Sequence, residues 1–136
     1  MGDAGSLPFT QLDFLYMPSA DVAADVSYAV DVLGARLVFA IEAVGTRVAM
    51  VQLTETPPAL IFAGHLDGER PVMVFRVDDL DEATENLKDR GMHEGHSFGI
   101  PHGPGVEFTT PGGHRIAIYE LTRPGAADHL VGLVDF

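Results

Sequence analysis

Three histidines that lie close together in the sequence, His93, His96 and His102, are the side chains best suited to hold a metal ion. Imidazole nitrogens are common ligands of zinc, iron, nickel and copper. An odd number of positions separates His93 from His96, so on a regular strand they would point to opposite faces. The stretch around them is rich in glycine and proline, which is more typical of a flexible hairpin than of a rigid coordination site. We therefore expect no metal here, and a non-standard site built from these histidines stays open as an alternative.

The sequence offers no nucleophile of the cysteine class. It contains no cysteine at all, which excludes disulfides, thiolate zinc sites and thiol catalysis. It also lacks a glycine-rich phosphate loop with a lysine. Glu107 and Glu120 are carboxylates in the second half of the chain, but spacing alone does not make them an acid–base pair. We expect both to be solvated or ion-paired.

The chain is strongly acidic. Its 136 residues include 20 Asp and Glu against 8 Lys and Arg, which gives a formal net charge of −12. A field of this sign repels phosphate backbones and anionic membranes, so we expect no nucleic-acid partner and no membrane association. No apolar run approaches the ~20 residues of a membrane span, and we see no secretion signal. Together with the lack of cysteine, these features predict one cytoplasmic domain.

Helix and strand signals occur twice along the chain in the same order. Each half is predicted to hold one strand, one helix and three further strands, with the helix N-caps in Ser19-Ala20-Asp21 and Asp78-Asp79 and with Gly34 and Gly91 as helix ends. The first strand of each half is expected at 11–17 and 71–77. We place module one at about 8–66, module two at about 70–123 and a tail at 124–136. A repeat of this length is a duplicated unit, because a solenoid needs at least three copies.

Three stretches of sequence carry a resemblance to a known family. The first runs from Asp21-Val22 to Val32-Leu33-Gly34, the second from Val77-Asp78-Asp79-Leu80-Asp81 to Lys88-Asp89-Arg90-Gly91, and the third is Thr110-Pro111-Gly112-Gly113 with the strand after it. In this order and spacing the chain resembles the vicinal-oxygen-chelate superfamily, which includes glyoxalase I, bleomycin-resistance proteins and extradiol dioxygenases. The resemblance implies an α+β fold of two βαβββ modules, whose curved mixed sheet surrounds a concave cleft. It also implies pairing into a homodimer.

The same resemblance implies where a catalytic metal would bind. Members of the superfamily carry His, Glu or Gln ligands on four strands, and the matching positions in this chain are Phe14, Ile61, Val72 and Ala117. A carbon side chain has no lone pair to donate to a divalent ion. We therefore expect a metal-free cleft with apolar walls and no cofactor.

Strand periodicity predicts which other side chains would share that cleft, because residues two apart on a strand share a face. Leu12 is expected on the same face as Phe14 and Tyr16. The predicted ligand-binding residues are Phe14, Tyr16, Ile61, Val72, Arg76, Arg115, Ala117 and Tyr119. Apolar and aromatic walls with a few polar groups are typical of a small-molecule site. For the two arginines, ordinary salt bridges at strand ends are the alternative role.

These features predict a metal-free binder of a small, partly aromatic or cationic molecule, acting by sequestration as bleomycin-resistance proteins do. The acidic composition suits a cationic ligand. The alternative is an enzyme of the same superfamily: a lyase, isomerase or dioxygenase with relocated metal ligands, or a metal-free catalyst that uses Tyr or Arg.

The tail at 124–136 is unusually apolar for a segment that follows the last predicted strand. Its apolar side chains include Leu130, Val131, Leu133, Val134 and Phe136. A cluster of apolar residues usually covers another surface. We expect the tail to be ordered and to pack either on the cleft or on a second subunit.

Overall fold

The computed structural model of the chain describes residues 7–43, 45–92 and 94–136. Within this part, eight strands form one mixed sheet in the order β2-β3-β4-β1-β5-β8-β7-β6. The strands are β1 (Gln11–Pro18), β2 (Arg36–Ala43), β3 (Thr46–Gln52), β4 (Ala59–Ala63), β5 (Val72–Val77), β6 (His96–Ile100), β7 (Gly103–Thr109) and β8 (Arg115–Glu120).

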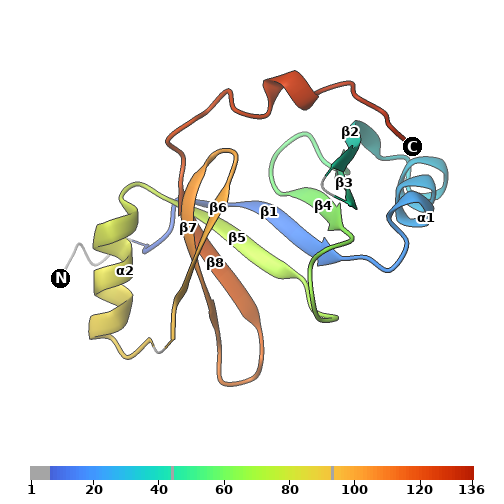
Figure 1. Cartoon of the computed structure of the whole chain (residues 1–136). Coiled ribbons are helices and arrows are strands. Elements are labelled where there is room, and N and C mark those ends of the chain that lie inside the picture. Colours follow the sequence, from blue (N-terminus) through green and yellow to red (C-terminus); the bar gives the residue numbers. More distant parts are fainter. Residues whose placement is uncertain (1–6, 44, 93) are drawn as a thin grey trace.

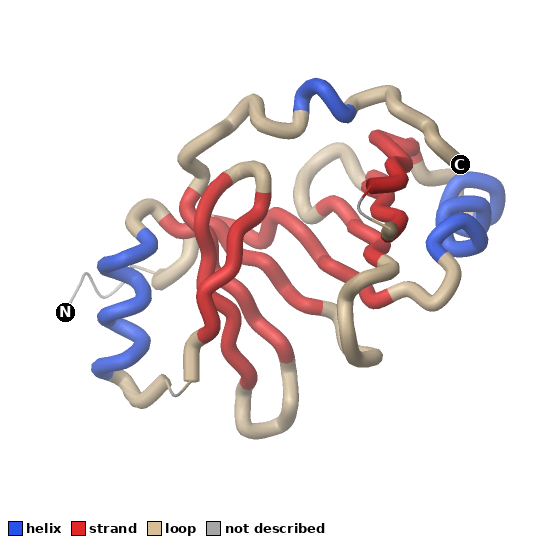
Figure 2. Tube along the Cα trace, viewed as in Figure 1, coloured by secondary structure: helices blue, strands red, loops and turns tan. Residues whose placement is uncertain are grey.

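The sheet consists of two modules with the same topology. Module one holds β1 to β4 and module two holds β5 to β8, and the antiparallel pairing of β1 with β5 joins them side by side. Each module pairs its first strand in parallel with its last, β1 with β4 and β5 with β8. Figure 1 shows β1 and β5 in the middle of the molecule, with the helices at opposite ends, and Figure 2 shows the curvature of the strands around them. The predicted α+β fold of two βαβββ modules is confirmed.

The helices begin at the predicted caps. The Asp21 carboxylate accepts a hydrogen bond from the Ala24 amide before α1 (Val22–Ser27), and Asp79 accepts one from the Glu82 amide before α2 (Leu80–Asp89), both at 3.0 Å. The first helix departs from the expected regular α-helix, because its last part is the π-helical turn η1 (Tyr28–Val32). No helix of the described residues combines the length and the hydropathy that a membrane span requires.

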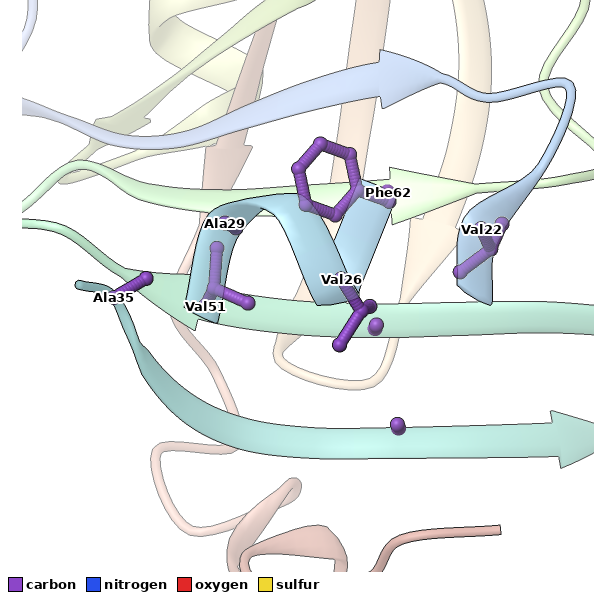
Figure 3. Packing of buried hydrophobic residues seen from close by; sticks show 8 residues of the cluster. Val22, Val26, Ala29, Ala35, Val51 and Phe62 are labelled. Atoms are coloured by element: carbon purple, nitrogen blue, oxygen red, sulfur yellow. The ribbon is translucent and has the colours of Figure 1, made fainter. Parts of the chain in front are cut away.

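Small side chains on the sheet of module one let the first helix pack closely. Ala40 of β2 and Ala49 of β3 have no exposed surface, and both pack against the helical residues Val22, Val26 and Ala29. Figure 3 shows this cluster, in which helical side chains lie over the strands. In module two, α2 covers the equivalent face through a cluster that includes Val77, Leu80 and Ile118.

The tail predicted at 124–136 is ordered and crosses from module two to module one; we call residues 124–136 the strap. It contains the short 3-10 helix η2 (Asp128–Leu130) and then runs parallel to β2. The Ala40 amide donates to the Leu133 carbonyl at 2.8 Å, and the Asp135 amide donates to the Ala40 carbonyl at 2.7 Å. Figure 1 shows the strap reaching the end of the molecule that carries α1. The strap thus extends the sheet beyond β2.

Candidate ligand-binding site

A cavity of about 170 Å³ lies over the concave face of module one. Its walls come from the strands of module one, from the turn between β6 and β7, and from the strap. The lining residues are Phe14, Tyr16, Phe39, Ile41, Val48, Met50, Ile61, Ile100, Pro101, His102, Ala127 and Leu130. None of these described residues is an aspartate, glutamate, lysine or arginine, so the wall carries no counter-charge for the cationic ligand that the acidic composition suggested.

Alternation along β2 and β3 creates the floor of the cavity. Phe39 and Ile41 flank Ala40 on β2, and Met50 follows Ala49 on β3. Because successive side chains point to opposite faces, the alanines meet the helix while the large side chains face the cavity. These cavity residues were not predicted from the sequence. The signal that would have identified them is the repeated alternation of large apolar residues with alanine.

Three of the eight predicted site residues line the cavity: Phe14, Tyr16 and Ile61. Another three, Val72, Ala117 and Tyr119, lie outside its wall. They are 3 %, 1 % and 1 % exposed and pack together with Val74 in a cluster that Phe14 and Tyr16 also contact. These three residues therefore support the cavity wall from within module two and fill the space that the sequence assigned to a ligand.

The two predicted arginines lie away from the cavity wall. Arg115 donates to the Asp67 carbonyl at 2.7 Å and to the Arg70 carbonyl at 3.1 Å, and it pairs with Glu107 at 3.6 Å. Arg76 pairs with the Asp13 carboxylate at 3.5 Å. Both arginines therefore form salt bridges, which was the alternative role predicted for them from the sequence.

A bulge in β1 brings a carboxylate onto the concave face. The register of β1 against β5 shifts between Leu12 and Phe14, and Leu12 is paired with Phe75, which packs on the α2 side. The predicted placement of Leu12 on the face of Phe14 is therefore wrong, because the extra residue of a bulge breaks the two-residue period. Asp13 takes that place and is 8 % exposed.

Asp13 has partners on three sides. Its carboxylate accepts hydrogen bonds from the Tyr119 hydroxyl and the Gln11 side-chain amide, besides the ion pair with Arg76. Burial and the hydrogen bond to Asp13 raise the pKa of Tyr119 far above its ordinary range. Tyr119 is thus a permanent donor to Asp13, and the pair ties β8 of module two to β1 of module one.

His102 is the residue of the cavity wall with the most chemical capacity. Burial lowers the pKa of its imidazole, an effect that the charges of Asp13 and Asp128 only partly offset. Its ring lies 5.5 Å from the Phe14 ring, centroid to centroid. A neutral imidazole carries one donor and one acceptor nitrogen. The side chain can therefore pair with an uncharged polar group or accept a proton.

The backbone around His102 is held firmly. Its carbonyl accepts from the amides of Thr122 and Arg123 at 3.0 and 2.9 Å. The Arg123 guanidinium donates to the carbonyls of Ile100 and Pro101 at 3.2 and 2.7 Å. A Cβ atom at Gly103 would overlap the Glu120 carbonyl, so the residue after His102 must be glycine. The turn that presents His102 is preorganised by these contacts.

The donor set of the site does not fit a resident metal. The four positions that carry ligands in the resembled superfamily lie on the four central strands, β1, β4, β5 and β8, and all four are hydrocarbon side chains. Among residues 7–43, 45–92 and 94–136, no three His, Cys, Asp or Glu side chains gather as a metal ion would need. His96 is exposed on β6, apart from the cavity that His102 lines, and His93 lies outside the described residues.

One serine motif has the spacing of a nucleophile elbow but not its structure. Gly95-His96-Ser97-Phe98-Gly99 matches Gly-x-Ser-x-Gly, and that motif activates a serine when a sharp turn leads from a strand into a helix. Here it lies in β6, which forms a hairpin with β7. Ser97 is therefore an exposed residue of an edge strand.

Comparison with known proteins gives a consistent family and fold. The model of the Glyoxalase/Bleomycin resistance protein/Dioxygenase superfamily matches residues 11–118. The crystal structure of methylmalonyl-CoA epimerase from Mycobacterium tuberculosis is similar with a TM-score of 0.72 and 21% identity, over 93% of this chain and 97% of that one. A catechol 2,3-dioxygenase structure is similar with a TM-score of 0.62 and 18% identity, over 82% of this chain and 41% of that one.

A further solved structure with this fold contains a bound ligand. Streptomyces coelicolor methylmalonyl-CoA epimerase in complex with 2-nitronate-propionyl-CoA is similar with a TM-score of 0.65 and 16% identity, over 84% of this chain and 96% of that one. At these identities the structural likeness concerns the fold alone. No curated protein sequence matches the chain.

Proposed function

The chain belongs to the glyoxalase/bleomycin resistance protein/dioxygenase superfamily, and from this premise we propose that it binds a small apolar molecule without a metal ion. The observation that carries the proposal is the chemistry of four positions. Phe14, Ile61, Val72 and Ala117 stand on the four central strands where relatives are expected to place metal ligands, and none of them can coordinate a divalent ion.

The cavity of module one supplies the binding surface. Nine of its twelve lining residues carry hydrocarbon or thioether side chains and a tenth is proline, with only Tyr16 and His102 offering polar atoms. Removing an apolar molecule from water into such a site is favourable by about 25 cal/mol for each Å² of buried surface. The protein thus needs no reactive group to act by sequestration. Pairing into a homodimer and a cytoplasmic location belong to the same proposal.

Two strap variants test the proposal directly. Ala127→Trp would fill the cavity, whereas Ala126→Trp places the same side chain on a neighbouring residue outside the lining. We expect toluene to shift the amide resonances of the cavity residues in the unaltered chain and in the Ala126→Trp variant, and to leave those of Ala127→Trp unchanged. Toluene binding that survives in Ala127→Trp would contradict the assigned cavity.

Metal dependence is tested on the same samples. We expect elemental analysis to find no stoichiometric transition metal, and we expect toluene affinity to stay unchanged after chelator treatment and after addition of zinc, nickel, iron or manganese. An affinity that falls on chelation and returns with one of these ions would refute the metal-independent proposal and direct attention to the histidines.

An enzyme is the second candidate function, and one observation favours it. His102 keeps a neutral imidazole beside an apolar cavity, which is the state in which it can act as a general base. Turnover of an added ligand that is lost in His102→Gln, while binding remains, would favour this candidate. Binding without any chemical change of the ligand favours sequestration.

A further inference from the structure

We propose that the cavity of module one selects uncharged molecules of single-ring size that carry one polar group, and that His102 is the residue that recognises this group. The inference rests on the proposed binding function and narrows it to a class of ligand. It uses three independent properties of the cavity: its size, the charge of its walls and the free hydrogen-bonding capacity of His102.

Size sets the first limit. A cavity of about 170 Å³ is close to the engineered 150 Å³ protein cavity that holds benzene, and it is smaller than the roughly 300–1,000 Å³ of sites for drug-sized ligands. The strap fixes this size from outside through Ala127 and Leu130. One six-membered ring with a small substituent therefore fills the space, whereas a larger antibiotic or a coenzyme thioester would have to extend beyond it into solvent.

The walls set the second limit. No charged side chain lines the cavity among the described residues, so a charged ligand would lose its hydration without gaining a counter-charge. The Asp13 carboxylate, which is buried on the concave face, is already paired with Tyr119, Gln11 and Arg76. Asp128 of the strap is exposed and remains in water. An ammonium or a carboxylate on the ligand is therefore disfavoured, despite the net charge of −12 for the whole chain.

His102 supplies the polar contact. The hydrogen bonds that fix this residue come from its backbone carbonyl, while its ring nitrogens bond to no other described residue. Tyr16 is the other polar side chain of the wall, and burial raises the pKa of its hydroxyl, which stays protonated. A ligand hydroxyl or carbonyl that meets a preorganised imidazole in an apolar cavity gains a hydrogen bond that few other positions of the wall can offer.

Isosteric pairs of ring compounds measure the charge limit. Benzyl alcohol and benzylammonium have the same shape and differ in charge, and so do benzamide and benzoate. We expect the neutral member of each pair to bind the intact chain at least about tenfold more tightly, because the charged member pays the cost of desolvation. Dissociation constants come from titrations followed by amide resonances of the cavity residues. Equal affinity within either pair would overturn the inference.

The role of His102 is measured with phenol and toluene, which are also isosteric. We expect phenol to bind about fivefold more tightly than toluene, the size of one added hydrogen bond. His102→Leu should remove this preference and keep toluene binding, whereas the control His65→Leu, at an exposed histidine outside the cavity, should keep it. His102→Gln, which retains a donor and an acceptor, should restore part of the preference.

Other results are equally decisive. If Tyr16→Phe removes the preference for phenol and His102→Leu does not, Tyr16 is the recognising residue and the assignment to His102 is wrong. If toluene binds but the chain does not distinguish the charged from the neutral member of each isosteric pair, this inference is overturned and the proposed function stays intact. If neither toluene nor phenol binds the folded chain, the proposed function fails and the inference fails with it.

Discussion

The two modules share one topology and use their concave faces in opposite ways. In module two, Val74, Ala117 and Tyr119 pack into a cluster that Phe98 and Ile100 of the same module cover. In module one, the corresponding face carries Phe39 and other large apolar side chains but keeps a cavity above them. The difference lies in what covers each face: module two is covered by its own hairpin, and module one by the strap and by a turn of its neighbour.

This difference shows that a duplicated fold does not imply a duplicated site. The strands of both modules are apolar on the concave side, so the strands alone do not decide whether space remains for a ligand. The segment that packs over the strands decides it. The β6–β7 hairpin brings long side chains down onto its own sheet, whereas the strap contributes only Ala127 and Leu130 to the cavity wall.

Introducing a charged side chain should distinguish most strongly between the packed concave face of module two and the concave face of module one, which carries the cavity. Ala117→Glu places a carboxylate where 1 % of the residue is exposed, and we expect the free energy of unfolding to fall by roughly 3–5 kcal/mol. Met50→Glu, at a half-buried position of the cavity floor, should cost only about 1–2 kcal/mol because the charge reaches water. Urea denaturation measures both values. Equal losses would mean that the two faces are equally packed.

Removal of the strap should affect one module far more than the other. Deleting residues 125–136 removes the half-buried Leu130 and Phe136 and the hydrogen bonds to β2, and we expect a loss of roughly 2–4 kcal/mol. Hydrogen exchange should become faster at the amides of Ala40 and Glu42, which donate to the strap. Amides of β5 and β8 should keep most of their protection. Uniform acceleration across both modules, or none at all, would contradict this division.

The Asp13–Tyr119 contact tests how firmly the two modules are joined. Asp13→Asn leaves the half-buried Arg76 without its counter-charge, and we expect a loss of roughly 1–3 kcal/mol. Tyr119→Phe removes only the hydroxyl donor and should cost about 1 kcal/mol. A double-mutant cycle by thermal or urea unfolding gives the coupling between them. A coupling near zero would show that the contact does not bind the modules together.

A small pH effect is expected at the boundary between the modules. The pKa of His102 in the folded chain lies below its ordinary value, so the unfolded chain takes up this proton first as the pH falls through about 6.5. Stability should therefore decrease with falling pH in that window until the folded-state pKa is passed. The charges that act on this imidazole are those of Asp13 and Asp128. His102→Gln should remove this slope, and an NMR titration of His102 with a midpoint above 6.5 would show the opposite sign.

Much of the fold follows from local sequence signals. The caps Asp21 and Asp79 bind the amides expected of them, and Gly34 takes the positive φ of +78° that a helix end favours. Three local features escaped the periodic patterns: the bulge at Asp13, the register shift between Leu37 and Phe39 of β2, and the π-helical turn η1. Each interrupts the regular period, so positions on its two sides no longer follow one pattern. A two-residue period counted back from Phe14 across the bulge therefore places Leu12 on the wrong face.

The candidate site was predictable only in part. Phe14, Tyr16 and Ile61 follow from strand alternation and lie in the cavity wall. Val72 and Ala117 pack in the cluster that Phe14 and Tyr16 contact, yet the space beside them is filled by neighbours from distant parts of the chain. His102 was considered for its metal-binding capacity, and its place in the cavity depends on a turn fixed by residues 122 and 123. Such contacts between distant segments leave no periodic trace in the sequence.

The strap has a consequence for the order in which the molecule is made. Its Asp135 carboxylate accepts from the Glu42 amide across 93 residues of sequence, so β2 receives this partner long after its own synthesis. Contacts of such separation form late, because a long loop must close before they contribute. A nascent chain that has left the ribosome only as far as residue 123 already exposes both modules, whereas Ala127 and Leu130 of the outer cavity wall have yet to emerge. The capacity to hold a ligand is therefore acquired only after both modules have emerged.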